Sequence, residues 1–152
     1  MSATVEDVWA ALEDLADPEI PVISLRDLGI LREVRTGADG LEVVITPTYS
    51  GCPAMGQIED DLRSTLKNRG ISARIVTRLA PAWTTDWMTD AGKEKLRAYG
   101  IAPPHLKAAE AQPLRFHPKD IACPRCASTN TQRLSAFGST ACKALYLSLI
   151  HI

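Results

Sequence analysis

Hydrophobic residues recur at intervals of three and four in several parts of the chain, which is the spacing of an amphipathic helix. The first such helix is predicted near the N-terminus, where Thr4 and Asp7 resemble a capping box. Its apolar side is formed by Val5, Val8, Trp9, Leu12 and Leu15. A second helix is predicted over Pro53–Arg69, followed by Gly70 at the cap position, and a shorter one over Asp90–Tyr99. The buried stripe of the second helix is predicted to be Met55, Ile58, Leu62 and Leu66.

Strands are predicted between these helices. Ile30–Arg35 and Leu41–Thr46 flank Thr36–Gly40, whose glycines suit a hairpin turn, so the pair is expected to be antiparallel. Apolar and polar residues alternate over Ile71–Leu79, which predicts a third strand. The two prolines of Asp17–Pro21 predict an ordered loop. The order helix, strand, strand, helix, strand, helix describes an α/β (α+β) layer.

Charge and composition divide the chain into parts. Residues 1–100 carry 11 Lys and Arg against 16 Asp and Glu, a net charge of −5, whereas residues 101–152 carry 6 against 2, a net charge of +4. Residues 101–118 contain four prolines and few large apolar side chains, as linkers do. We therefore predict an α/β domain over 1–100, a linker over 101–118 and a partial zinc ribbon over 119–146.

The composition of the whole chain limits the classes of partner. Hydrophobic residues make up 45% of the 152 residues and the formal net charge is −1, so a buried core is expected and strong attraction to nucleic acid is not. The sequence contains no apolar run that approaches the ~18 residues of a membrane span. We expect a cytoplasmic protein that does not associate with membranes, and nucleic-acid binding is the less favoured function.

Cys52 is the first candidate for chemistry, because it lies between a predicted strand and the helix predicted to begin at Pro53. Proline is favoured at the first helical position, which would place Cys52 at or next to the N-cap. Unpaired amides and the helix dipole at that position would lower the pKa of a thiol and favour the thiolate. Such a sulfur can attack an electrophile or bind a soft metal. A small, partly buried cap residue without chemistry is an equally good interpretation.

Support for this thiol is expected from polar residues nearby in the predicted fold. Asp17 and Glu19 offer carboxylates, and Thr46 and Thr48 offer hydroxyls at the end of a strand. Surface acids and ordinary strand threonines are the alternative. No histidine precedes His105, so residues 1–100 contain no Cys–His dyad, which argues against a thiol protease or acyltransferase.

Two of the three tryptophans, Trp83 and Trp87, fall on one side of a predicted helical turn. They could line a ligand cleft or cover the end of the sheet. We favour packing, because burial is the commoner use of an indole.

The C-terminal part contains the pattern of a metal knuckle. Cys123 and Cys126 are separated by two residues, a spacing that lets two thiolates bind one tetrahedral zinc ion. A complete ribbon needs a second such pair, but Cys142 is alone and His151 is the only other soft ligand beyond it. These four residues would form a Cys3His site only with a nearly terminal histidine as anchor. A redox pair is the alternative for Cys123 and Cys126, although no thioredoxin-like pattern surrounds them.

Four separated motifs resemble the D subunit of bacterial phenylacetyl-CoA 1,2-epoxidase, and the resemblance covers residues 8–146. The motifs are Asp17–Pro21 with Leu28–Ile30, Thr48–Met55, Pro81–Trp87 and Phe137–Tyr146. The first 100 residues also resemble the small α/β domain of SufT-like iron-sulfur assembly proteins. In that superfamily the cysteine that matches Cys52 is the reactive one.

The resemblance implies an accessory role. The epoxidase system has a di-iron oxygenase component and a reductase with flavin and a [2Fe-2S] cluster, and these components are the implied partners. The D subunit resembles a maturation factor for their iron or iron-sulfur centres, with a structural zinc in its ribbon and a transient cluster or iron as cargo. A structural adaptor that bridges oxygenase and reductase without touching metal is the alternative.

The sequence departs from this family after Tyr146. Members continue into a second Cys-x-x-Cys pair and an aromatic finish, whereas this chain ends in Leu147–Ile152. That hexapeptide is what the codons CTG TCT CTT ATA CAC ATC encode, and they match a transposon end used in sequencing libraries. We hypothesise that residues 147–152 are not native, which removes His151 as a trusted ligand. Different codons in the nucleotide sequence would refute this hypothesis.

Overall fold

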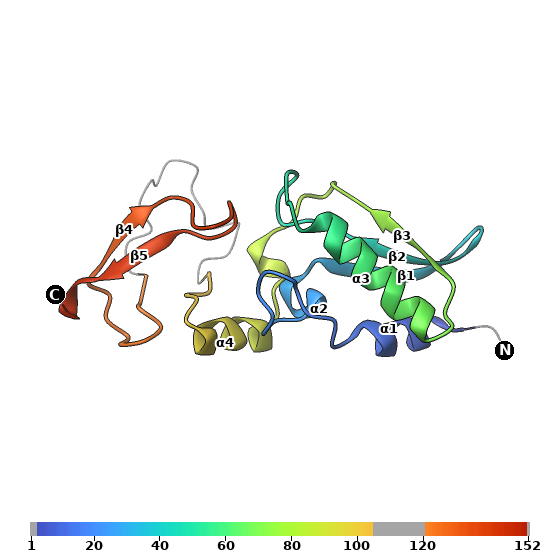
Figure 1. The fold of residues 1–152 in the computed structure, drawn as a ribbon, viewed down its shortest axis with the longest axis horizontal. Helices are drawn as coiled ribbons and strands as arrows, with labels where there is room; N and C mark the ends of the chain where they lie inside the picture. The colour runs from blue at the N-terminus through green and yellow to red at the C-terminus, as the bar shows by residue number, and fades with distance from the viewer. Residues whose placement is uncertain (1–2, 105–120, 152) are drawn as a thin grey trace. The chain divides into compact units, whose positions relative to one another are not determined.

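The computed structural model describes residues 3–104 and 121–151, and only the backbone of His151. The chain forms two compact units, Met1–Gly92 and Lys93–Ile152, which are described separately below (Figure 1). The first unit contains α1 (Val5–Leu12), α2 (Leu25–Leu28), β1 (Leu31–Gly37), β2 (Gly40–Ile45), α3 (Met55–Asn68), β3 (Ala73–Thr77) and η1 (Thr85–Trp87). The helix α4 (Asp90–Tyr99) begins at the end of the first unit, and the second unit contains β4 (Thr131–Ser135), β5 (Leu145–Ser148) and η3 (Leu149–His151).

The first unit is a sheet of three strands in the order β1-β2-β3, with helices packed against it (Figure 1). β1 and β2 form the predicted antiparallel hairpin, which turns between Gly37 and Gly40. β2 and β3 are parallel, because α3 carries the chain back to the start of the sheet between them. α1 packs on both α3 and β1, so α1 and α3 contribute to the core. The fully buried side chains include Val8, Leu12, Val43, Ile45, Ile58 and Leu62. The predicted α/β class is therefore confirmed.

The start of α1 confirms the predicted capping box. The Asp7 amide donates to the Thr4 hydroxyl at 3.2 Å, and the Thr4 amide donates to the Asp7 carboxylate at 2.8 Å. Together they satisfy two amides that a helix start leaves without intrahelical partners. The hydrogen bonds from the backbone and side chain of Thr4 lower the pKa of Asp7.

α3 has the predicted apolar stripe but begins later than predicted. Ile58, Leu62 and Leu66 are buried, and Gly70 follows the helix with a φ of 68°, a left-handed conformation that suits glycine. The first helical residue is Met55, not Pro53. Pro53 instead belongs to a turn that the Met55 amide closes by donating to the Cys52 carbonyl at 3.3 Å.

Two elements differ from the sequence prediction. β3 covers only Ala73–Thr77, because the Ile71 amide donates to the Leu66 carbonyl and so belongs to the end of α3. The four-residue helix α2 was not predicted. Ser24 caps it by accepting the Asp27 amide at 3.1 Å, and Gly29 ends it with a φ of 81°.

Charged side chains on the three strands are paired with one another. Glu42 on β2 lies between Arg35 on β1 and Arg74 on β3 and forms an ion pair with each. The hydrogen bond from Arg74, and then that from Arg35, lower the pKa of Glu42. All three strands are therefore joined by side-chain ion pairs as well as by backbone hydrogen bonds.

The second unit contains an antiparallel hairpin of β4 and β5. Its register pairs Thr131 with Ser148 and Arg133 with Tyr146, and a bulge follows Arg133. Strand pairing therefore includes the first two residues of Leu147–Ile152; it does not test whether they are native, because strands pair through the backbone. The predicted linker lies largely outside the described residues. No helix in the described part of the chain is long and apolar enough to cross a membrane.

Candidate functional site

Cys52 lies in the connection between β2 and α3, in two successive turns. Its amide donates to the Tyr49 carbonyl at 3.2 Å, and its carbonyl accepts the Met55 amide at 3.3 Å. The N-cap of α3 is Ala54, so Cys52 lies two residues before the N-cap and not, as predicted, at or next to it. The thiol is half-buried. Its function as a reactive thiol stays a prediction.

The predicted supporting residues have different surroundings. Asp17 is buried, and its Oδ1 accepts the amides of Glu19 at 2.8 Å and Ile20 at 2.9 Å. Its own amide donates to the Ile23 carbonyl at 2.9 Å, so Asp17 organises the loop that the prolines predicted. Glu19 itself is half-buried.

The two threonines follow β2 directly. Thr46 is buried, and its amide donates to the Ile30 carbonyl at 2.9 Å, which extends the β1–β2 pairing. Thr48 is half-buried on the way to Cys52. Support of the thiol by Asp17, Glu19 or Thr48 stays a prediction.

Trp83 and Trp87 both pack around the end of α2. The Trp83 indole N–H donates to the Leu28 carbonyl at 3.0 Å. A Cβ on Gly29 would lie 2.8 Å from the Trp87 Cβ, so only glycine lets Trp87 approach this closely. The Arg32 guanidinium lies 3.6 Å from the centroid of the Trp87 ring, which is a cation–π contact. These are the contacts that the packing interpretation expects.

Cys123 and Cys126 form a compact knuckle. The Cys123 amide donates to the Ser128 carbonyl at 2.9 Å, and the Ala127 amide donates to the Cys123 carbonyl at 2.8 Å. Ala127 has a φ of 58°, which closes the turn. The backbone amides of Arg125 and Cys126 donate to the Cys123 sulfur and lower the pKa of that thiol. The backbone is thus arranged to stabilise a thiolate, as a metal ligand requires.

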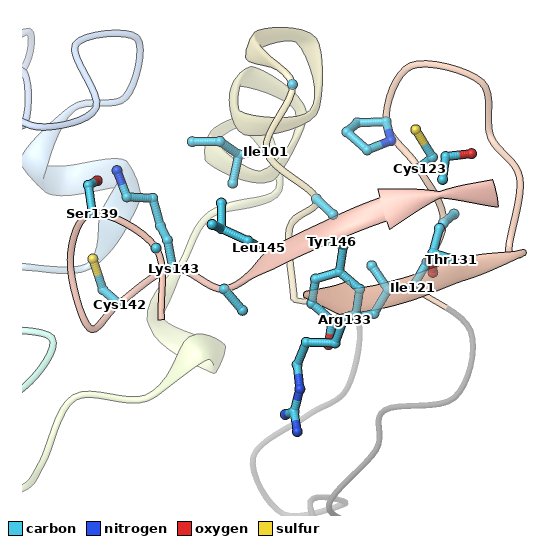
Figure 2. A pocket seen from close by; sticks show the side chains of 17 residues that line it. Ile101, Ile121, Cys123, Thr131, Arg133, Ser139, Cys142, Lys143, Leu145 and Tyr146 are labelled. Atoms are coloured by element: carbon cyan, nitrogen blue, oxygen red, sulfur yellow. The ribbon is translucent and has the colours of Figure 1, made fainter. Parts of the chain in front are cut away.

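Cys142 is not brought to this knuckle. It lies at the opposite end of the hairpin from Cys123, as Figure 2 shows. Its thiol is exposed and lies 3.0 Å from the Thr140 hydroxyl. Within residues 3–104 and 121–151, no three His, Cys, Asp or Glu side chains are grouped so that they could hold a metal ion. The predicted ligand set of Cys123, Cys126 and Cys142 is therefore not assembled, and the side chain of His151 lies outside the described residues.

A cavity of about 650 Å³ in the second unit was not predicted from the sequence (Figure 2). Its lining includes Ile101, Ile121, Arg133, Lys143, Tyr146 and Ser148. The alternation along β4 and β5 would have placed Arg133, Tyr146 and Ser148 on one face, but neither strand was predicted because each is short and flanked by polar residues.

Two family models match separate parts of the chain. Residues 5–72 match the family model of an iron-sulfur cluster assembly protein, and residues 107–147 match that of the PaaD zinc beta ribbon domain. The first match includes Cys52 and the second includes Cys123, Cys126 and Cys142. The chain therefore combines an assembly-type domain with a zinc ribbon.

Relatives extend the comparison to most of the chain. The chain is 46% identical over 143 residues to a protein of Escherichia coli (strain K12) that is named as the putative D subunit of 1,2-phenylacetyl-CoA epoxidase, covering 93% of this chain and 84% of the relative. It is 37% identical over 90 residues to an Fe-S protein maturation auxiliary factor of Porphyromonas gingivalis (strain ATCC BAA-308 / W83), covering 57% of this chain and 85% of the relative. The crystal structure of a domain of unknown function, DUF59, from Bacillus anthracis is similar with a TM-score of 0.54 at 25% identity, covering 60% of this chain and 89% of that one. This chain belongs to the family of the phenylacetyl-CoA epoxidase D subunit.

The zinc ribbon family implies a zinc ion, and the described residues fit only part of a closed zinc site. A structural zinc takes four ligands in a tetrahedron, most of them thiolates or imidazoles. The knuckle supplies two thiolates, Cys123 and Cys126, with amides already directed at one sulfur. Zinc would be held there through these two sulfurs, and the described residues offer no third thiolate to it.

Proposed function

We propose that this chain is an accessory protein that assists the assembly of iron-sulfur or iron centres in the phenylacetyl-CoA epoxidase system. Cys52 is the thiol that meets the cargo. The observation that carries this proposal is the position of Cys52, half-buried in a turn inside the segment that matches iron-sulfur assembly proteins. The relative named as a maturation auxiliary factor supports the same role.

The chemistry of the first unit suits metal handling better than hydrolysis. Thiolates are the usual protein ligands of iron-sulfur clusters. A hydrolytic cysteine needs a base that removes its proton, and this base is most often a histidine. Residues 1–100 contain no histidine. Asp17 and Glu19, in the proline-containing loop, and Thr48, after β2, are the residues proposed to support the thiol. The cluster or iron is cargo in this scheme and not a resident cofactor.

The proposed partners are the oxygenase and reductase components of the system. A structural adaptor that bridges them is the second candidate, and one observation favours it. The hairpin of the second unit exposes large apolar side chains: Leu134 is 60%, Phe137 63% and Leu145 52% exposed. Large apolar side chains that are exposed on one hairpin and the segment that joins its strands are what a protein contact would use.

Reconstitution distinguishes the two candidates. The oxygenase and reductase components would be produced with the parent chain, with Cys52→Ser or with Cys142→Ser, and their iron and acid-labile sulfide would be measured. The assembly role predicts low iron and sulfide with Cys52→Ser and normal content with Cys142→Ser, a matched control on an exposed thiol. A normal iron and sulfide content of the components produced with Cys52→Ser would exclude a role of the Cys52 thiol in assembly. A stable complex on gel filtration that is indifferent to Cys52 would instead support the adaptor.

A further inference from the structure

The cavity in the second unit has a wall that carries positive charge (Figure 2). Arg133 on β4 and Lys143 just before β5 both line it, and its lining residues include no Asp or Glu. Within the described part of the chain, neither of these two cations forms an ion pair with a carboxylate. Residues 121–151 contain three Lys or Arg and no Asp or Glu. An anion that enters this cavity is therefore attracted by its wall and meets no opposing carboxylate there.

The connection between β4 and β5 folds into a closed loop at one end of the cavity. The Gly138 amide donates to the Lys143 carbonyl at 2.5 Å, and the Lys143 amide donates to the Thr140 carbonyl at 3.4 Å. The four amides between them, from Ser139 to Cys142, donate to no acceptor among the described residues. Figure 2 shows Ser139, Cys142 and Lys143 at this end of the cavity. Successive amides in a turn, next to an ammonium group, form a concavity that suits an anion.

The rest of the wall suits the organic body of a small molecule. Ile101, Ile121 and Leu145 supply apolar surface, and Tyr146 supplies a half-buried aromatic ring. The volume of about 650 Å³ lies within the range of roughly 300–1,000 Å³ that small-molecule sites have. Such sites combine an apolar wall with a few polar groups that fix the orientation of the ligand. The cavity therefore fits a molecule with one anionic end and a less polar body.

We propose that this cavity binds an organic phosphate, with the phosphate on the Gly138–Lys143 loop and the body of the molecule against Ile101, Leu145 and Tyr146. A terminal phosphate has three acceptor oxygens, whereas a carboxylate has two. It can therefore use more of the four amides, the Ser139 hydroxyl and the Lys143 ammonium that the loop offers. Nucleoside diphosphates and coenzyme A share this chemistry.

Isothermal titration calorimetry of the full chain, under reducing conditions, tests this proposal. The probes are ADP, coenzyme A, inorganic pyrophosphate and phenylacetate, which is an apolar molecule with a carboxylate. ADP and coenzyme A should bind more tightly than pyrophosphate, which has no organic body to bury against the apolar wall. Both should also bind more tightly than phenylacetate. Equal affinities for ADP and coenzyme A would assign the site to the diphosphate portion that they share, and tighter binding of coenzyme A would assign it to the longer molecule.

Substitutions at Lys143 test the position of the phosphate. Lys143→Gln removes a charge-assisted hydrogen bond and should weaken ADP binding at least about tenfold. Lys143→Arg keeps the positive charge and should keep most of the affinity. Lys95→Gln is the matched control, because Lys95 lies on α4 in the same unit and does not line the cavity. It should leave ADP binding unchanged.

The exposed thiol of Cys142 gives a second measurement, because it also lines the cavity. Bound ADP should slow the alkylation of Cys142, read by peptide mass spectrometry, and leave that of Cys52 in the first unit unchanged. The proposal would be overturned if neither ADP nor coenzyme A binds at millimolar concentration, or if phenylacetate binds as tightly as ADP. It would also be overturned if Lys143→Gln binds ADP like the parent chain, or if bound ADP leaves the alkylation of Cys142 unchanged.

This proposal is independent of the role of Cys52. The measurements report ligand binding by the second unit, whereas the proposed function is tested by the iron content of partner proteins. The proposal also does not depend on whether Leu147–Ile152 is native, because the whole Gly138–Lys143 loop precedes that segment.

Discussion

The loop that contains Asp17 offers a sharp test of which role this residue has. Asp17→Ala removes an acceptor that binds two amides, those of Glu19 and Ile20, at 2.8 and 2.9 Å. Asp17→Asn keeps a side-chain oxygen in the same place but removes its charge. The two substitutions therefore separate the geometry of the loop from the charge of the carboxylate.

The magnitude follows from these two hydrogen bonds. Each bond to a charged acceptor contributes about 1.5–3 kcal/mol, and a buried amide left without a partner adds to the loss. Asp17 is only 6% exposed and Ile20 8%, so water cannot fully replace the carboxylate at the Ile20 amide, while the Glu19 amide is partly accessible. We expect Asp17→Ala to lower the free energy of unfolding by about 3 kcal/mol, and Asp17→Asn by about 1 kcal/mol because a neutral acceptor remains.

Urea unfolding followed by tryptophan fluorescence measures this change in the right part of the chain. Trp9, Trp83 and Trp87 are the only tryptophans, and all three lie in the first unit, so the signal reports that unit. The difference in midpoint at constant slope gives the change in the free energy of unfolding. The alkylation rate of Cys52 in the folded variants, read by peptide mass spectrometry, measures any effect on the thiol.

Two results would refute this reasoning. If Asp17→Ala changes stability by less than about 0.5 kcal/mol, the two hydrogen bonds do not organise the loop. If Asp17→Asn changes the alkylation rate of Cys52 while stability is kept, the charge of Asp17 acts on the thiol and its role is not confined to the loop.

Three other predictions are independent of this loop. The pKa of Asp7 is lowered in the folded state, so the capping box stabilises the protein at pH values above the usual pKa of Asp, and this contribution is lost as the pH falls through the lowered value. Thr4→Ala should flatten that part of the pH–stability curve and lower Tm by about 5 °C near neutral pH, as calorimetry would show. Gly29→Ala should lower Tm by roughly 10 °C, because it combines a φ of 81° with a Cβ 2.8 Å from Trp87, and an unchanged Tm would contradict this close contact. Cys142→Ser should leave the zinc affinity of the chain within about twofold of that of the parent chain, as measured by competition with a chromophoric zinc chelator. A large loss of zinc affinity would place Cys142 among the ligands.

The main elements of the first unit could be predicted because they follow local rules. The capping box at Thr4 and Asp7 and the turn between Gly37 and Gly40 each depend on residues a few positions apart. The helix α2 escaped prediction although Ser24 and Gly29 are ordinary cap residues, because one turn of helix is too short to show a periodic pattern. Its ends are fixed by tertiary contacts, such as the Trp83 indole on the Leu28 carbonyl.

The candidate sites also contain features that depend on nearby residues and features that depend on tertiary contacts. The spacing of Cys123 and Cys126 identified the knuckle, because its geometry is local. Cys52 was expected at or next to the N-cap of α3 but lies two residues before it, since Pro53 can begin a helix or continue a turn and the sequence does not distinguish these outcomes. The contact between the Ser148 hydroxyl and the Cys126 sulfur could not be predicted, because it depends on strand register across 22 residues.

The strand register has a consequence for insertions and deletions in the ribbon. The segment that joins β4 to β5 can change in length without moving Ser148, because its pairing with Thr131 is set at the opposite end of the strands. Removal of a single residue between Tyr146 and Ser148 would turn every later side chain to the other face, since successive residues of a strand alternate. As far as strand pairing is concerned, the connection between β4 and β5 can therefore vary in length, whereas the number of residues in β5 cannot.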